Sequence, residues 1–225
     1  MEWITRYQLF LFDFDGLLVD TERLHFLAYI EMCANRGFKL TWNFEQFCEA
    51  AHFKSFGLKD AIYEEFPGLY AMEPRWEILY QEKREAYERL LENGKLELMP
   101  GVEVLLTKLE QRGIRRCVVT NSPRKQIDRI KRFFPVLDTI PLWITREDYN
   151  LPKPAPDGYL KAIEVMGQPG DQIIGFEDSM KGLQALLAAG VEGILICPNN
   201  LPQVAECAQL GVDHFETLLE VPSII

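Results

Sequence analysis

Two carboxylates, Asp13 and Asp15, stand at the end of the short apolar stretch YQLFLFDF that begins at Tyr7. Side chains two residues apart on an extended chain point to the same side, so these carboxylates would lie close together. Like charges at the end of a buried strand repel one another and are poorly solvated. A divalent cation with oxygen ligands would relieve that cost. A few carboxylates together with a substrate phosphate suit Mg²⁺.

Three other polar clusters contain residue types that could complete such a site. Thr120-Asn121 and Glu177-Asp178 each stand at the end of an apolar run, and Lys153 stands between two prolines. Asp178 would add a third carboxylate for the cation, and Lys153 would help to neutralise a bound phosphate. One aspartate could then attack phosphorus while the other handles the proton.

The same residues also have structural interpretations that need no ligand. Asp13 and Asp15 could form a turn after a strand, and Lys153 could be a solvated loop residue. Ser122 could cap a helix that Pro123 starts, although a helix N-terminus also favours phosphate. The functional interpretation therefore depends on whether the fold brings all the clusters together.

A parallel sheet would bring them together. Strands are predicted at 7–14, 114–120, 172–176 and 193–197, with a short apolar stretch at 140–144, and helices are predicted near residues 100, 122, 156, 179 and 201. Strands and helices that alternate at this spacing indicate crossovers and a doubly wound, mostly parallel α/β sheet. In such sheets ligands bind beyond the carboxyl ends of the strands, which is where the polar clusters stand.

Residues 19–96 have a different pattern, with no convincing strand and with apolar residues at helical spacing. We therefore expect an α/β catalytic core made of residues 1–18 and 97–225. An all-helical domain of residues 19–96 would be inserted after the first strand.

The four clusters, in their order, resemble the haloacid dehalogenase superfamily. The matching segments are FDFDGLLVDTE at 12–22, VVTNS at 118–122, KPAPD at 153–157 and GFEDS at 175–179. A lone D-x-D would be weak, whereas four motifs in order are specific. The helical segment resembles the cap of the beta-phosphoglucomutase and sugar-phosphatase branch, so the resemblance spans nearly the whole chain.

The resemblance implies that Asp13 is a nucleophile that becomes aspartyl-phosphate and also binds Mg²⁺. Asp15 would be the general acid/base, with its backbone carbonyl on the metal. The dehalogenase members lack this acid, so its presence favours phosphoryl transfer. The implied enzyme is a Mg²⁺-dependent phosphatase acting on a small phosphorylated metabolite, such as a sugar phosphate.

The other roles follow from the same resemblance. Thr120 and the backbone of Asn121 would hold the transferring phosphoryl group, and Lys153 would neutralise charge on the nucleophile and the phosphate. Asp178 would be a metal ligand, and Glu177 would partner the metal directly or through another group.

A phosphosugar mutase of the beta-phosphoglucomutase type is the alternative reaction. His25 matches a cap-proximal histidine of those mutases, but many phosphatases of the branch have it too. The mutases also carry a cap arginine, and Lys54 is the nearest match here, which replaces a bidentate fork with a point charge. This departure favours hydrolysis. A non-catalytic module that binds a metabolite or a partner would lack a nucleophile, acid or metal ligand, and this sequence keeps all three.

The composition excludes several other classes of protein. The 225 residues carry a net charge of −10, which repels nucleic acid and anionic membranes. The five cysteines form no C-x-x-C pair and their number is odd, so neither a disulfide framework nor a zinc site is expected. No signal peptide or membrane segment is apparent, and nothing requires more than a monomer. We expect a cytoplasmic enzyme.

Overall fold

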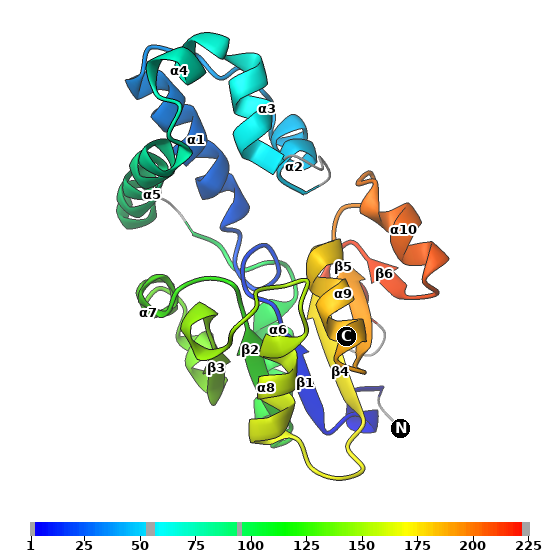
Figure 1. The fold of residues 1–225 in the computed structure, drawn as a ribbon. Coiled ribbons are helices and arrows are strands. Elements are labelled where there is room, and N and C mark those ends of the chain that lie inside the picture. Colours follow the sequence, from blue (N-terminus) through cyan, green and yellow to red (C-terminus); the bar gives the residue numbers. More distant parts are fainter. Residues whose placement is uncertain (1–2, 53–56, 94–95, 222–225) are drawn as a thin grey trace. The chain divides into compact units, whose positions relative to one another are not determined.

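The computed structural model describes residues 3–52, 57–93 and 96–221 (Figure 1). The chain divides into two compact units. The larger unit consists of Met1–Asp20 with Glu97–Ile225, and the smaller unit is Thr21–Leu96. Each unit has its own hydrophobic core.

The larger unit is built on a six-stranded sheet in which all neighbouring strands run parallel. Its strands are β1 (Leu9–Phe12), β2 (Arg115–Val119), β3 (Leu142–Ile144), β4 (Ile173–Glu177), β5 (Glu192–Ile196) and β6 (Asp213–Phe215). Their order in the sheet is β3-β2-β1-β4-β5-β6, so the doubly wound α/β fold is confirmed.

The strand order changes direction beside β1. Leu11 pairs with Cys117 of β2 on one side and with Gly175 of β4 on the other. The chain winds from β1 toward one edge and then returns to wind from β4 toward the other. A crevice forms at the carboxyl ends of the strands where winding reverses, and this topology places Asp13 at that point.

Helices cover the sheet because parallel strands are joined by crossovers. The helices of this unit are α6 (Val102–Gln111), α7 (Arg124–Lys131), α8 (Asp157–Met166), α9 (Met180–Ala188) and α10 (Gln203–Gln209). Alternate strand residues face opposite sides. Leu9, Leu11 and Cys117 pack with residues of α8 and α9, which lie in front of the sheet in Figure 1.

Short 3₁₀ segments complete the larger unit. They are Trp3–Arg6, Pro135–Thr139, Arg146–Asp148 and Leu218–Glu220. Trp3 extends an aromatic group on the other face of the sheet, where the rings of Phe10, Phe12 and Phe176 stack. The sheet is therefore apolar on both faces, as its strand sequences indicate.

The described residues of the smaller unit form helices joined by short loops, with no strand among them. Its helices are α1 (Glu22–Asn35), α2 (Phe44–His52), α3 (Gly57–Glu65), α4 (Pro67–Met72) and α5 (Trp76–Asn93). Tyr29, Met32, Phe47, Ile62 and Leu79 form the centre of its core. Apolar residues at helical spacing, such as Tyr29 and Met32 of α1, therefore pack inside the unit.

The element boundaries differ from the sequence expectation in a few places. The first strand ends at Phe12, so Asp13 and Asp15 lie in the turn that follows it. Strand β6 and helix α4 were not predicted because each is short and lacks a clear apolar period. Across the described part of the chain, no helix combines the length and apolar character that a bilayer span requires.

Candidate active site

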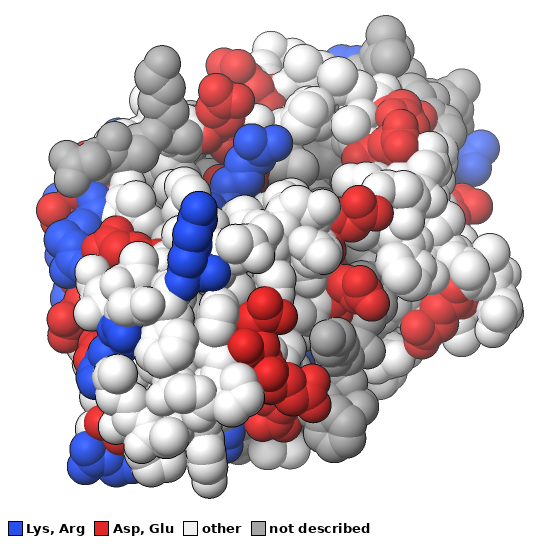
Figure 2. All heavy atoms as spheres, turned by 90° about the horizontal axis from the view of Figure 1, so that it is seen from above, with Lys and Arg blue, Asp and Glu red and all other residues white. Residues whose placement is uncertain are grey.

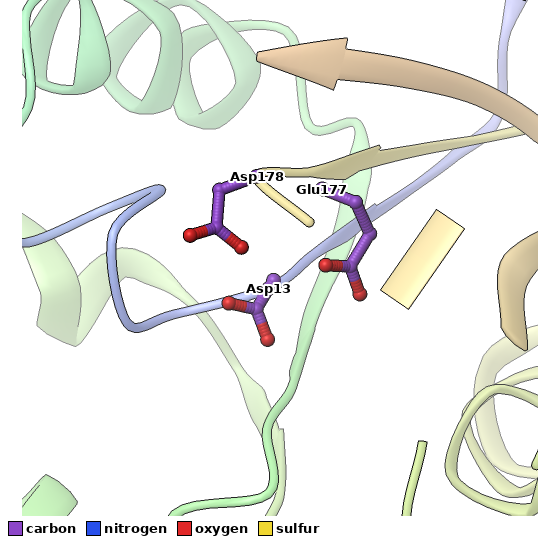
Figure 3. Close-up of side chains that lie close together, drawn as sticks. All are labelled: Asp13, Glu177 and Asp178. Carbon is purple, nitrogen blue, oxygen red and sulfur yellow. The ribbon is translucent and has the colours of Figure 1, made fainter. Parts of the chain in front are cut away.

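Three carboxylates meet where β1 and β4 end. The backbone N–H of Asp13 donates to the Phe176 carbonyl at 3.0 Å, which extends the strand pairing and sets Asp13 beside Glu177. One oxygen from each of Asp13, Glu177 and Asp178 lies within 4.8 Å of the others (Figure 3). Asp13 is 8% exposed and Glu177 is fully buried, so water screens their charges poorly.

Lys153 provides positive charge at the centre of this group. Its Nζ donates to Asp13 Oδ1 at 2.5 Å, to Glu177 Oε1 at 2.6 Å and to the Val119 carbonyl at 2.8 Å. The three hydrogens of the ammonium group thus have three acceptors. The lysine is held between the two carboxylates and is no solvated loop residue.

The electrostatics of the site reflect an excess of negative charge. Burial raises the pKa of Asp13 well above its usual range; Lys153 opposes this rise, and the nearby Glu177 and Asp15 carboxylates add to it. Burial would lower the pKa of Lys153, but the adjoining Asp13 and Glu177 carboxylates raise it above its usual value. The lysine therefore stays charged, and the carboxylates around it call for further positive charge.

The donor set fits a hard divalent cation. The three clustered side chains offer only oxygen, and no described residue donates a hydrogen bond to the buried Oε2 of Glu177. Buried carboxylate oxygens without donors are stabilised by a cation. Mg²⁺ is the ion that this arrangement suits, with Asp13, Glu177 and Asp178 as the residues that could hold it.

Thr120 and Asn121 lie at the end of β2, beside the lysine. The Asn121 side-chain oxygen accepts a hydrogen bond from the Lys153 backbone N–H at 3.2 Å and another from the Tyr149 hydroxyl at 2.7 Å. The same hydroxyl lies 2.8 Å from the Thr120 carbonyl oxygen. Burial raises the pKa of Tyr149 to about 12, so the phenol keeps its proton and remains a donor.

Asp15 accepts hydrogen bonds from hydroxyl groups of the loop that follows β2. Ser122 Oγ donates to Asp15 Oδ2 at 2.5 Å, and Thr120 Oγ1 donates to the same oxygen at 3.4 Å. Gln126 Nε2 lies 3.4 Å from Asp15 Oδ1. Gly16, with φ of +78°, makes the turn that returns the chain after Asp15.

One structural interpretation from the sequence is wrong. Ser122 does not cap the helix that follows it, because α7 begins at Arg124 after Pro123 and has no side-chain cap. The Ser122 hydroxyl instead donates to Asp15. The Ser179 side chain, by contrast, does accept the Gly182 N–H and caps α9.

The sequence interpretation missed three polar residues of this site: Tyr149, Tyr159 and Gln126. The Tyr159 hydroxyl donates to Glu177 Oε1 from α8. Tyr159 also stands in the apolar pattern of α8, so its periodicity indicates only a core residue. Tyr149 and Gln126 lie in a loop and on a polar helix, where nothing in the sequence marks them.

The two candidate substrate residues belong to the smaller unit. His25 lies on α1, where its ring stacks on Tyr87 at a centroid distance of 4.3 Å and its Nδ1 lies 2.6 Å from Lys83 Nζ. The Lys83 side chain is buried among the Tyr29, Tyr80 and Tyr87 rings. Lys54 lies outside the residues that the structure describes.

Surface charge is dispersed on the face shown in Figure 2. Acidic side chains occur there in several separate groups among uncharged residues, and basic side chains occur mainly toward one side. The chain carries 34 acidic against 24 basic residues, which agrees with this distribution. An anionic substrate would therefore depend on local positive charge such as that of Lys153.

Comparison with known proteins gives the same picture as the motifs. The family described as "Haloacid dehalogenase-like hydrolase" matches residues 10–196. The chain is 29% identical to "Protein CbbY" of Rhodobacter capsulatus over 188 residues, which cover 82% of this chain and 83% of that protein. It is 25% identical to a "Phosphorylated carbohydrates phosphatase" of Thermotoga maritima over 225 residues, covering 94% and 96% of the two chains.

A solved structure shares the fold. It is that of a mutant CbbY from Rhodobacter sphaeroides in complex with xylulose-(1,5)bisphosphate. The TM-score is 0.70 at 22% identity, and the match covers 96% of both chains. At this identity the likeness concerns the arrangement of helices and strands, which agrees with the fold described above.

Proposed function

The chain belongs to the haloacid dehalogenase-like hydrolase family, and from that premise we propose that it is a magnesium-dependent phosphatase of small phosphorylated metabolites. The observation that carries the proposal is the contact of Lys153 Nζ with both Asp13 and Glu177. A carboxylate at the end of a buried strand, with an ammonium group on one oxygen, is prepared to receive an anionic phosphoryl group.

Asp13 is the nucleophile in this proposal. A carboxylate oxygen of Asp13 forms a bond to phosphorus, and the bond from phosphorus to the ester oxygen breaks. Bound Mg²⁺ supplies positive charge that favours the ionised nucleophile and offsets the charge of the phosphate. The positive charge of Lys153 reduces the repulsion between the Asp13 carboxylate and the incoming phosphate.

Asp15 handles the proton in both halves of the reaction. It gives a proton to the leaving alcohol oxygen and then takes one from the water that attacks phosphorus in the aspartyl-phosphate. The products are the alcohol, inorganic phosphate and the original Asp13 carboxylate. The hydroxyls of Ser122 and Thr120 donate to Asp15 Oδ2 and so orient this side chain.

Thr120 and the Asn121 backbone hold the phosphoryl group, and Tyr149 supports them by its contacts with the Thr120 carbonyl and the Asn121 side chain. A sugar phosphate is the substrate class we propose. The support for it is that the Thermotoga relative is a phosphatase of phosphorylated carbohydrates and that the CbbY structure holds a sugar bisphosphate. In this proposal the helical unit, with His25, selects the sugar.

The test is phosphate release from a panel of hexose, pentose and aryl phosphates, with and without Mg²⁺. Asp13→Asn should abolish turnover, and Asp171→Asn is the matched control because Asp171 is a hydrogen-bonded aspartate near the start of β4. Conversion of beta-glucose 1-phosphate into glucose 6-phosphate without net phosphate release would establish the mutase instead. No turnover of any ester would remove the proposal.

A further inference from the structure

Glu177 is held by more than the lysine. It is the last residue of β4 and is fully buried. Its Oε1 receives hydrogen bonds from Lys153 Nζ, at 2.6 Å, and from the Tyr159 hydroxyl. One carboxylate oxygen is therefore shared by an ammonium group and a phenol.

Tyr159 approaches this oxygen from the third position of α8. Its side chain is fully buried in the core between α8 and the sheet, which leaves the ring no room to turn away. Lys153 Nζ lies 5.0 Å from the centre of the Tyr159 ring, which is the distance of a cation–π contact. The tyrosine thus contacts both members of the Lys153–Glu177 pair.

Gly182, in the first turns of α9, leaves the space in which this carboxylate lies. A Cβ atom at position 182 would lie 1.9 Å from Glu177 Oε2 and 2.0 Å from its Cδ. Helix propensity favours alanine over glycine in a helix by about 1 kcal/mol, so the helix itself does not require a glycine here. The carboxylate of Glu177 does require it.

We propose that Tyr159 and Gly182 are positioning residues of the reaction, which act by fixing Glu177 so that Glu177 holds Lys153 against Asp13. This inference rests on the proposed phosphatase function. Tyr159 donates to the carboxylate on one side, and Gly182 admits it on the other. Neither residue needs to contact the substrate, because the effect passes through Glu177 to the lysine.

Tyr159→Phe removes one hydroxyl and keeps the ring. Glu177 Oε1 then loses a donor, and the carboxylate is less firmly held against Lys153. We expect kcat to fall about tenfold, which corresponds to about 1.4 kcal/mol of transition-state stabilisation. KM should change by a factor of about three or less, because the substrate contacts remain.

Gly182→Ala forces the Glu177 carboxylate to move, because the new Cβ would overlap the carboxylate itself and not the flexible end of an apolar side chain. We expect a fall in kcat of about a hundredfold or more, larger than that of Tyr159→Phe. Gly193→Ala is the matched control. A Cβ atom at position 193, on β5, would lie 2.6 Å from Leu183 Cδ1 of α9. This variant therefore crowds the helix that contains Gly182 without touching a carboxylate.

Tyr7→Phe is the matched control for the tyrosine. The Tyr7 hydroxyl donates to Glu192 Oε1 at 2.6 Å. Glu192 is the first residue of β5, so this contact lies at the end of the sheet opposite to the site. Tyr7→Phe therefore loses a tyrosine–carboxylate hydrogen bond of the same kind away from the site. We expect it to keep the kcat and KM of the unaltered enzyme.

The deciding experiment is a cycle of Tyr159→Phe, Glu177→Gln and the double variant, with steady-state kinetics on the best ester of the panel. If Tyr159 acts through Glu177, Tyr159→Phe costs about twofold or less in the Glu177→Gln background. An equal cost in both backgrounds, or an unchanged kcat in Tyr159→Phe, overturns the inference while leaving the phosphatase intact. An unaltered enzyme without phosphatase activity overturns the proposed function and the inference together.

Discussion

Lys153 Nζ lies 2.5 Å from Asp13 Oδ1, although 140 residues separate the two in the chain. Both side chains are about nine-tenths buried, with exposed fractions of 7% and 11%. A buried ion pair of this kind is costly to assemble and contributes little net stability. Its presence at the switch point of the sheet therefore agrees with a catalytic use for the pair.

Replacing Lys153 by an uncharged residue of similar length should show how much of the activity depends on its charge. Lys153→Met keeps most of the side-chain length but leaves Asp13 and Glu177 without their common donor. We expect phosphatase activity to fall by about a thousandfold or more, since a charge that acts in the transition state is lost. Steady-state kinetics on the preferred ester would measure this.

The matched control for that variant is Lys161→Met on α8. The Lys161 side chain is 42% exposed and forms a surface ion pair with Glu164 at 2.8 Å. Exposed pairs of this kind contribute about 0–1 kcal/mol, so the control should keep its activity and stability. Activity of Lys153→Met close to that of the control would contradict the role given to Lys153.

Asp15→Asn should show the behaviour of a lost general acid. With a sugar phosphate, whose leaving alkoxide needs a proton, we expect kcat to fall about a hundredfold or more. An aryl phosphate has a better leaving group, so the rate of the first step, in which that group leaves, should fall less. A pre-steady-state comparison of the two esters measures the difference, and equal losses for both would argue against Asp15 as the acid.

Magnesium should stabilise the protein through the carboxylate cluster. A ligand that binds only the folded state at a hundred times its Kd adds about 2.7 kcal/mol to the free energy of unfolding. Thermal unfolding with and without Mg²⁺, in the presence and absence of a chelator, measures this increment.

Asp178→Asn should remove most of the increment, because Asp178 belongs to the oxygen cluster that fits the cation. Asp138→Asn is the control, since the Asp138 side chain is 69% exposed and lies outside that cluster. If Asp178→Asn keeps the whole magnesium-dependent stabilisation, Asp178 is not a ligand.

A pH dependence of stability is expected from the Arg115–Asp171 pair near the start of β4. The hydrogen bond from Arg115 Nη2 to Asp171 Oδ1, 2.5 Å long, lowers the pKa of Asp171, and burial opposes it. The folded-state pKa therefore lies below the unfolded value. The stabilisation is present above the unfolded pKa and is lost as pH falls through the folded pKa.

Asp171→Asn should accordingly lower the free energy of unfolding at pH 7 by about 1 kcal/mol. The difference from the unaltered protein should be smaller at a pH below the folded-state pKa, where the aspartate is protonated in both states. Urea denaturation at the two pH values tests this. If the difference in the free energy of unfolding is the same at both pH values, the charge of Asp171 is not the cause of the lower stability.

The sequence by itself determined the fold class and the position of the polar clusters. The apolar run before Asp13 and the alternation of helices and strands after residue 96 indicate a parallel sheet, because strands buried on both faces are short and almost wholly apolar. The carboxyl ends of parallel strands share one edge. The predictions of the doubly wound sheet and of the hydrolase family were therefore possible without coordinates, and both are confirmed.

Only the tertiary structure decided which groups touch. Tyr159 has the spacing of an ordinary core residue, and whether its hydroxyl meets a carboxylate depends on how α8 lies against β4. Gly182 lies in a helix, and its sequence context does not reveal that the Glu177 carboxylate fills the space where a side chain at this position would lie. Local sequence encodes periodicity and turns, whereas contacts between distant segments depend on packing geometry to within an ångström or so.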